Sequence, residues 1–108
     1  MLAKALNTIG IAKCANKISY GETLIKDIQN RKVCLVVICK DTSDNSKKKI
    51  IDKCNYYKCE YIVEFNQEEI IKVIAREDPV SAVGIKDFNI AKKLKENLLR
   101  KGEVNGKE

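Results

Sequence analysis

The run VCLVVIC, from Val33 to Cys39, constrains the fold of this chain more than any other feature. It is a continuous apolar stretch rich in β-branched residues, which is typical of a strand that is covered on both of its faces. The run is much shorter than the roughly 20 apolar residues that span a bilayer. We therefore expect Val33–Cys39 to be a central strand, with helices packed on both sides of its sheet.

The segments around this run alternate between helical and strand patterns. Five segments carry apolar residues at helical spacings: Leu2, Leu6, Ile9 and Ala12; Leu24, Ile25 and Ile28; Ile50, Ile51, Cys54 and Tyr57; Ile70, Ile71 and Ile74; and Phe88, Ala91, Leu94 and Leu98. The third segment predicts a helix over Ser46–Tyr57, and Pro79 is expected to end the fourth. Caps are supplied by DTSDNS, by Asn66 with Glu69, and by Asp87. EYIVEF and VSAVGI read as short strands. This alternation predicts an α/β fold, a three-layer α/β/α sandwich around a central mixed sheet of about four strands.

The length of 108 residues suits one domain. We predict that residues 1–101 form it and that the polar residues 102–108 are a C-terminal tail. Met1–Ala15 lacks the sustained apolar core of a signal peptide. We therefore expect a cytoplasmic protein that is not bound to a membrane and keeps its five cysteines as free thiols. We also expect it to be a monomer.

Charge is distributed unevenly along the chain. Residues 1–58 carry 12 basic and 5 acidic side chains, a balance of +7, whereas residues 59–87 carry 3 and 7, a balance of −4. Residues 88–108 carry 6 basic and 3 acidic side chains, a balance of +3. A strongly basic surface attracts polyanions, above all nucleic acid, although the same charge also serves general solubility.

The sequence offers little that resembles catalysis. It contains no histidine, the commonest general base and metal ligand. Its glycines are too few and wrongly spaced for a phosphate-binding loop. Cys34 and Cys39 form one C-x4-C pair, and Cys54 and Cys59 form another. A strand would place the first pair about 16 Å apart on opposite faces, too far to share a zinc ion. We predict no catalytic residue, no metal and no cofactor.

The stretch KISYGETLIK, from Lys17 to Lys26, has two interpretations. Ser19 and Glu22 fit a capping box, and Glu22 and Lys26 fit an i, i+4 ion pair, with Gly21 only a small residue of the first turn. Alternatively, the N-terminus of the helix binds phosphate through its amides, and Lys26 adds a mobile cation.

Longer stretches resemble a known family. CKDTSDNSKKKIIDKCNYYKCEY and AREDPVSAVGI, together with KISYGETLIK, resemble the bacterial, ribosome-associated branch of the L-seven-Ae/L-thirty-e ribosomal protein superfamily. The resemblance is collinear from about Leu6 to Leu98. It implies an α/β/α sandwich whose partner is structured RNA, ribosomal RNA or a kink-turn. A kink-turn is a sharply bent RNA with tandem sheared G·A pairs.

The resemblance also implies a site. The family binds RNA through a Gly-x-Asn-Glu-x-x-Lys motif at the start of its second helix, and through the loop before its final strand. Aligned without gaps, the Lys falls on Lys26, the Asn and Glu on Glu22 and Thr23, and the Gly on Tyr20, with Gly21 one place later. With nearby cations and the loop included, the implied RNA-binding residues are Lys17, Tyr20, Gly21, Glu22, Thr23, Lys26, Arg31, Lys32, Arg76, Pro79, Val80 and Ser81.

Two functional hypotheses follow from the sequence. The first is a non-catalytic RNA-binding protein that is ribosome-associated or holds a structured, kink-turn-like RNA. The alternative is a protein–protein adaptor that keeps the fold but has reduced or lost RNA affinity. The adaptor would use the acidic face of residues 60–78 together with Tyr56, Tyr57 and Tyr61, since tyrosines are enriched at interfaces.

Overall fold

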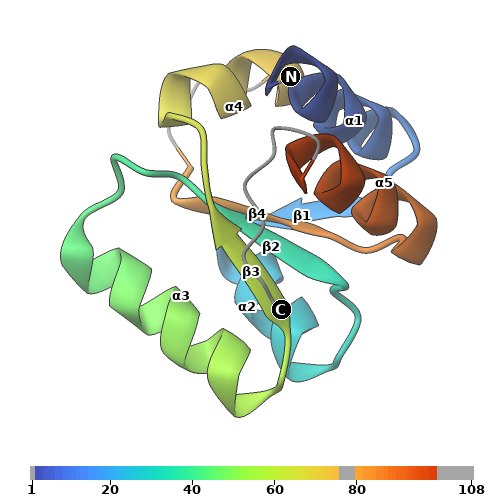
Figure 1. The fold of residues 1–108 in the computed structure, drawn as a ribbon. Coiled ribbons are helices and arrows are strands. Elements are labelled where there is room, and N and C mark those ends of the chain that lie inside the picture. The colour runs from blue at the N-terminus through green and yellow to red at the C-terminus, as the bar shows by residue number, and fades with distance from the viewer. Residues whose placement is uncertain (1, 76–79, 100–108) are drawn as a thin grey trace.

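The structure, a computed structural model, describes residues 2–75 and 80–99. These residues form five helices and one four-stranded sheet (Figure 1). In chain order the elements are α1 (Leu2–Cys14), β1 (Ile18–Tyr20), α2 (Glu22–Gln29), β2 (Leu35–Ile38), α3 (Asp44–Tyr56), β3 (Glu60–Val63), α4 (Gln67–Ile74), β4 (Ala82–Ile85) and α5 (Phe88–Leu99). The short strand β1 has no counterpart among the strands expected from the sequence.

The sheet is mixed, with strand order β1-β4-β2-β3. β2 pairs in parallel with β3 and antiparallel with β4, and β1 pairs antiparallel with β4. The strand predicted over Val33–Cys39 therefore lies inside the sheet, as expected, with its regular part at Leu35–Ile38. All four residues of that part are buried.

Helices cover both faces of the sheet, which confirms the three-layer α/β/α sandwich. Figure 1 shows α1, α4 and α5 on one face and α2 and α3 on the other. The alternation of side chains along β2 produces this division, because Leu35 and Val37 pack against α1, α4 and α5, whereas Val36 and Ile38 pack against α2 and α3. No helix within residues 2–75 and 80–99 is long and apolar enough to cross a membrane.

The predicted caps of α3 and α5 are confirmed, whereas the predicted end of α4 is wrong. Ser43 caps α3 by accepting a hydrogen bond from the Ser46 amide at 3.3 Å, and Asp87 accepts one from the Ile90 amide at the start of α5. However, α4 ends at Ile74, where Ala75 adopts a left-handed conformation, so the helix stops before Pro79 rather than at it. Phe88, expected in the apolar face of α5, is 69 % exposed.

Candidate functional site

Gly21 forms the turn between β1 and α2. This residue caps α2 with φ 69° and ψ −144°, a backbone conformation that is essentially restricted to glycine. Ser19 is a strand residue that pairs with Gly84, and its buried hydroxyl does not cap the helix. The capping box expected from Ser19 and Glu22 is therefore wrong, and Gly21 is more than a small residue of the first turn.

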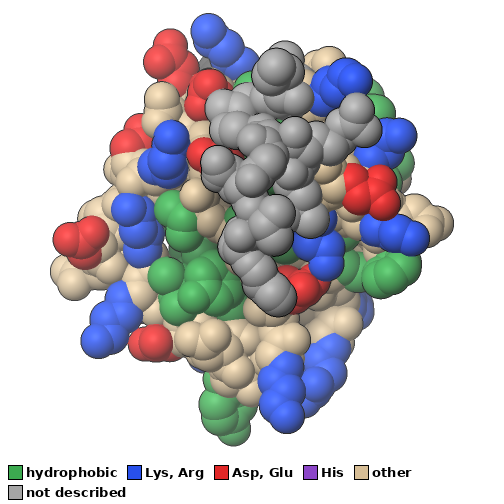
Figure 2. All heavy atoms as spheres, viewed as in Figure 1, with side chains coloured by type: hydrophobic (Ala, Val, Ile, Leu, Met, Phe, Trp, Pro, Cys, Tyr) green, Lys and Arg blue, Asp and Glu red, His purple; other side chains and the backbone are tan. Residues whose placement is uncertain are grey.

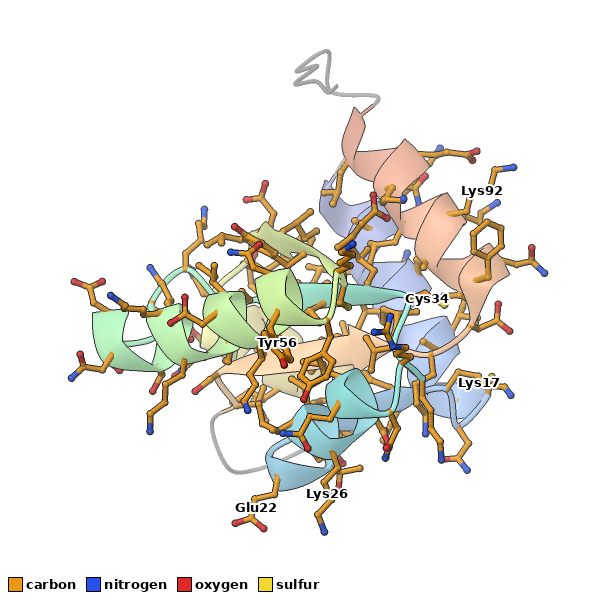
Figure 3. All side chains as sticks on the ribbon, turned by 90° about the horizontal axis from the view of Figure 1, so that it is seen from below. Lys17, Glu22, Lys26, Cys34, Tyr56 and Lys92 are labelled. Atoms are coloured by element: carbon orange, nitrogen blue, oxygen red, sulfur yellow. The ribbon has the colours of Figure 1, made fainter. Side chains whose placement is uncertain are left out.

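The first turn of α2 faces solvent. No side chain of the described residues caps its amides, and Glu22, Thr23 and Lys26 are all exposed. Figure 3 shows Glu22 and Lys26 projecting away from the body of the protein. The ion pair expected between them is absent from the described part of the chain. Lys26 is thus available to a ligand, as is the positive end of the helix dipole.

A cavity of about 320 Å³ lies beside this turn. Tyr20 and Gly21 line it from the β1–α2 junction, and Val80 and Ser81 line it from the segment before β4. The structure thus brings together two groups of predicted site residues that are sixty positions apart in the sequence. Ser46 and Lys49 of α3 also line this cavity, and the sequence-based site did not include them. The only sequence signal for Lys49 was the lysine run on the exposed side of the predicted third helix.

The segment before β4 is anchored to the end of β2. The Cys39 amide donates a hydrogen bond to the Ser81 carbonyl at 2.9 Å, and the buried Thr42 hydroxyl donates to the same carbonyl at 3.0 Å. The Cys39 thiol donates to the Val80 carbonyl at 3.4 Å. These contacts fix the wall of the cavity that faces α2. Arg76 and Pro79, the other two predicted residues of this loop, lie outside the described residues.

Thr23 lines a different cavity, which Tyr20 also lines. This second cavity also measures about 320 Å³ and includes Lys13, Asn16 and Ser19. Tyr20 lines both cavities. The start of α2 therefore presents Tyr20 between two cavities, with Thr23 in one and Gly21 in the other.

Three predicted cations lie away from the α2 N-terminus. β1 and α2 are joined at Gly21, where the chain reverses direction. Lys17 precedes β1, and Arg31 and Lys32 follow α2, so all three lie at the ends of these elements that are away from Gly21. Figure 3 shows Lys17 well separated from Glu22 and Lys26. The Lys17 carbonyl accepts a hydrogen bond from the Lys86 amide at 2.8 Å, which ties this end to β4. All three side chains are exposed, and none of them lines the cavity at Gly21 and Ser81.

The cysteines do not assemble a recognisable metal centre. Within residues 2–75 and 80–99, no cluster of three or more His, Cys, Asp or Glu could hold a metal ion. Cys34 and Cys39 pack against the same apolar cluster, rather than on opposite faces as expected, because Cys34 precedes the regular part of β2. Burial raises the pKa of Cys39 to about 12 and also raises the pKa of Cys34. A hydrogen bond from the Cys54 thiol lowers the pKa of Cys59.

The tyrosines of the expected adaptor surface differ in their exposure. Tyr57 and Tyr61 are half-buried and pack against the apolar cluster between the sheet and α2 and α3. Tyr56 is 77 % exposed. The three tyrosines therefore do not form one open surface. In the same region, Figure 2 shows hydrophobic side chains near β3, where Val63 is 39 % exposed, and basic side chains on the side of the molecule where α3 lies.

The fold of this chain is similar to the folds of two solved structures. One is a protein with unknown function from Bacillus halodurans, with a TM-score of 0.81, 33 % identity, and coverage of 87 % of this chain and 95 % of that one. The 15.5 kD RNA binding protein of Giardia lamblia has a TM-score of 0.71 over 89 % of this chain and 82 % of its own. At 16 % identity, that likeness concerns the fold alone.

The sequence then specifies the family. Residues 3–95 match the Ribosomal protein L7Ae/L30e/S12e/Gadd45 family, and the chain belongs to it. The chain is 43 % identical over 94 residues to "RNA-binding protein YlxQ" of Enterococcus faecium, covering 86 % of this chain and 89 % of the relative. It is 39 % identical over 87 residues to the protein of the same name in Bacillus subtilis, covering 80 % and 86 %. These bacterial relatives confirm the family resemblance found in the sequence.

Proposed function

We propose that this chain is a non-catalytic RNA-binding protein. In this proposal it holds a structured RNA, ribosomal or of kink-turn type, between the N-terminus of α2 and the segment before β4. The names of its two bacterial relatives and its membership of the L7Ae/L30e/S12e/Gadd45 family support RNA as the ligand.

The single observation that carries the proposal is the shared cavity of Gly21 and Ser81. It joins the two segments that the family resemblance implied, beside a helix N-terminus that is open to solvent. Amides at such a terminus bind phosphate oxygens, and the helix dipole favours negative charge there. Lys26 on α2 and Lys49 on α3 add two exposed cations on either side. These groups suit the backbone of an RNA that is bent into the cavity.

In this proposal, the side chains of Glu22 and Thr23 in the first turn of α2 recognise the RNA bases. Glu22 can accept hydrogen bonds from the amino or imino groups of guanine, because a carboxylate is an acceptor only. The Thr23 hydroxyl can both donate and accept. Contacts to the RNA backbone fix the position of the RNA, whereas the contacts of Glu22 and Thr23 to base edges determine which bases are preferred.

Gel-shift titration with a kink-turn RNA tests the proposal. Lys26→Ala should weaken binding by about 1–2 kcal/mol, or roughly tenfold in Kd, because it removes a charge-assisted contact to phosphate. Lys92→Ala is the matched control, since Lys92 is also an exposed lysine, lies on α5 and is far from Lys26 in Figure 3. It should change Kd little.

The same titrations distinguish the proposal from its alternatives. Binding should weaken steeply as salt rises, because phosphate contacts release counterions from the RNA. Equal effects of Lys26→Ala and Lys92→Ala would show that the site is wrong. If the unmodified protein binds no RNA in these titrations, the adaptor hypothesis is favoured. Crosslinking in cells, followed by sequencing of the attached RNA, would identify the natural ligand.

A further inference from the structure

A larger groove lies beside the proposed RNA site, between α2 and α3. Its volume is about 780 Å³, and its lining residues are Ile25, Lys49, Asp52, Lys53, Tyr56 and Tyr57. Ile25 and Lys49 also line the cavity at Gly21 and Ser81. The groove and that cavity are therefore adjacent, with these two residues in the wall of both.

Tyr56 lies at the far end of this groove. Its side chain is 77 % exposed, and its ring is in edge-to-face contact with Tyr57, with centroids 4.7 Å apart and an interplanar angle of 78°. Tyr57 in turn packs against the apolar cluster between the sheet and α2 and α3, so the contact links the ring of Tyr56 to the core. Figure 3 shows Tyr56 between α3 and α2. An exposed aromatic ring in this setting is positioned to stack on a planar group.

The charge of the groove favours an anionic strand. Two lysines and one aspartate line it, and the exposed side of α3 adds Lys48. Lys49 and Tyr56 are seven residues apart on the same helix, which corresponds to about 10 Å along its axis. A short nucleic-acid strand that leaves the cavity beside Lys49 would therefore reach Tyr56. Basic grooves with aromatic side chains are the usual means of binding single-stranded RNA.

We propose that the groove between α2 and α3 binds a single-stranded extension of the RNA held at the α2 N-terminus. An unpaired base stacks on Tyr56, and the phosphates before it contact Lys49 and Lys53. This inference rests on the proposed function and extends its site by a second contact surface. Because every base has an aromatic face, this contact adds affinity with little preference for sequence.

The test compares two RNAs with the full-length protein. One is a kink-turn RNA with blunt ends, and the other carries a short single-stranded oligouridine extension on one end. A third probe is the oligouridine alone. The variants are Tyr56→Ala, Tyr56→Phe, which keeps the ring, and Lys92→Ala as the distant control. Tyr56 is largely exposed, so its substitution should leave the fold intact, and thermal unfolding checks this.

The extended RNA should bind the unmodified protein about tenfold more tightly than the blunt RNA, the scale of one stacked base. Tyr56→Ala should abolish this gain and leave binding of the blunt RNA unchanged, whereas Tyr56→Phe should retain it. A photoreactive uridine in the extension should crosslink to the peptide that contains Tyr56. Lys26→Ala, in contrast, should weaken binding of both RNAs.

Two results would overturn the inference. In the first, the extension adds no affinity, Tyr56→Ala does not weaken binding of oligouridine alone, and the blunt RNA still binds through Lys26. The groove is then not an RNA surface, and the proposed function stands. That result would leave the groove to a protein partner. If no RNA binds the unmodified protein at all, the proposed function fails and this inference fails with it.

Discussion

Leu24 of α2 packs directly over the bare backbone of Gly84 in β4. A Cβ atom at Gly84 would lie 2.5 Å from the Cδ1 atom of Leu24, and 3.0 Å from a methyl group of Val33. Leu24 is buried, so it has little room to move aside. This close contact sets the height of α2 above the sheet, and it thereby positions the Gly21 turn at the proposed RNA site.

Gly84→Ala should therefore destabilise the protein. The added methyl group overpacks the α2–β4 interface, which costs about 1–3 kcal/mol of the free energy of unfolding. Chemical denaturation measures this cost. Gly10→Ala is the control, because a Cβ at Gly10 in α1 would meet its nearest neighbour, the Val73 carbonyl oxygen, only at 3.8 Å. That change should stabilise the protein by about 0.5–1 kcal/mol through helix propensity. A neutral Gly84→Ala would show that α2 can shift freely.

Ala75→Gly should stabilise the protein. Ala75 caps α4 with φ 57° and ψ 46°, a left-handed conformation that glycine adopts without strain. We expect a gain of about 0.5–1 kcal/mol in the free energy of unfolding. Ala15→Gly, at an exposed residue with a negative φ, should instead lower stability. The same sign for both changes, measured by thermal unfolding, would contradict the assigned conformation of Ala75.

Cys59 should be alkylated at lower pH than Cys34 or Cys39. The hydrogen bond from Cys54 stabilises the Cys59 thiolate and lowers its pKa, whereas burial raises the pKa of the other two thiols. Because the thiolate is the nucleophile, the rate for Cys59 should rise first as pH increases. Peptide mass spectrometry after iodoacetamide treatment follows each site. Cys54→Ala should move the Cys59 profile to higher pH, and an unchanged profile would rule out Cys54 as the cause.

The sequence predicted the layers of the fold because periodicity reports burial directly. The continuous apolar run at Val33–Cys39 identified an interior strand, and the helical spacings identified which faces of the helices are buried. The strand β1 was missed for a physical reason. It has only three residues, and its place in the sheet depends on antiparallel pairing with β4, far along the chain. Local residues also suggested a different role, because Ser19 and Glu22 match a helix cap.

The candidate site was predicted only as far as local sequence and family resemblance extend. Tyr20 and Gly21 were expected with Val80 and Ser81, and the structure places all four around one cavity. Lys49 was missed because the lysine run does not by itself show how α3 packs beside α2. Arg31 and Lys32 were included in the predicted site because they lie near the end of the helix that carries Lys26, but a helix of eight residues separates its two ends by about 12 Å.

Specificity for kink-turns should be weak in the unmodified protein. Glu22 and Thr23 occupy the positions of the Asn and Glu in the family motif, and both face solvent in the first turn of α2. An amide at position 22 could donate and accept at a base edge, whereas the carboxylate can only accept and also repels nearby phosphates. Backbone contacts through Lys26 are unaffected by this difference. We therefore expect binding with a small preference for kink-turns over plain duplex.

The double change Glu22→Asn with Thr23→Glu should sharpen this preference. It restores a donor at position 22 and a longer acceptor at position 23, and Gly21 before them keeps the backbone of the turn unchanged. Gel-shift titrations against matched RNAs, with and without the G·A pairs, measure the ratio of the two Kd values. The ratio should increase for the double variant and stay constant for Lys92→Ala. If the unmodified protein already discriminates by about a hundredfold, Glu22 itself contacts a base, and the family motif is not needed for recognition.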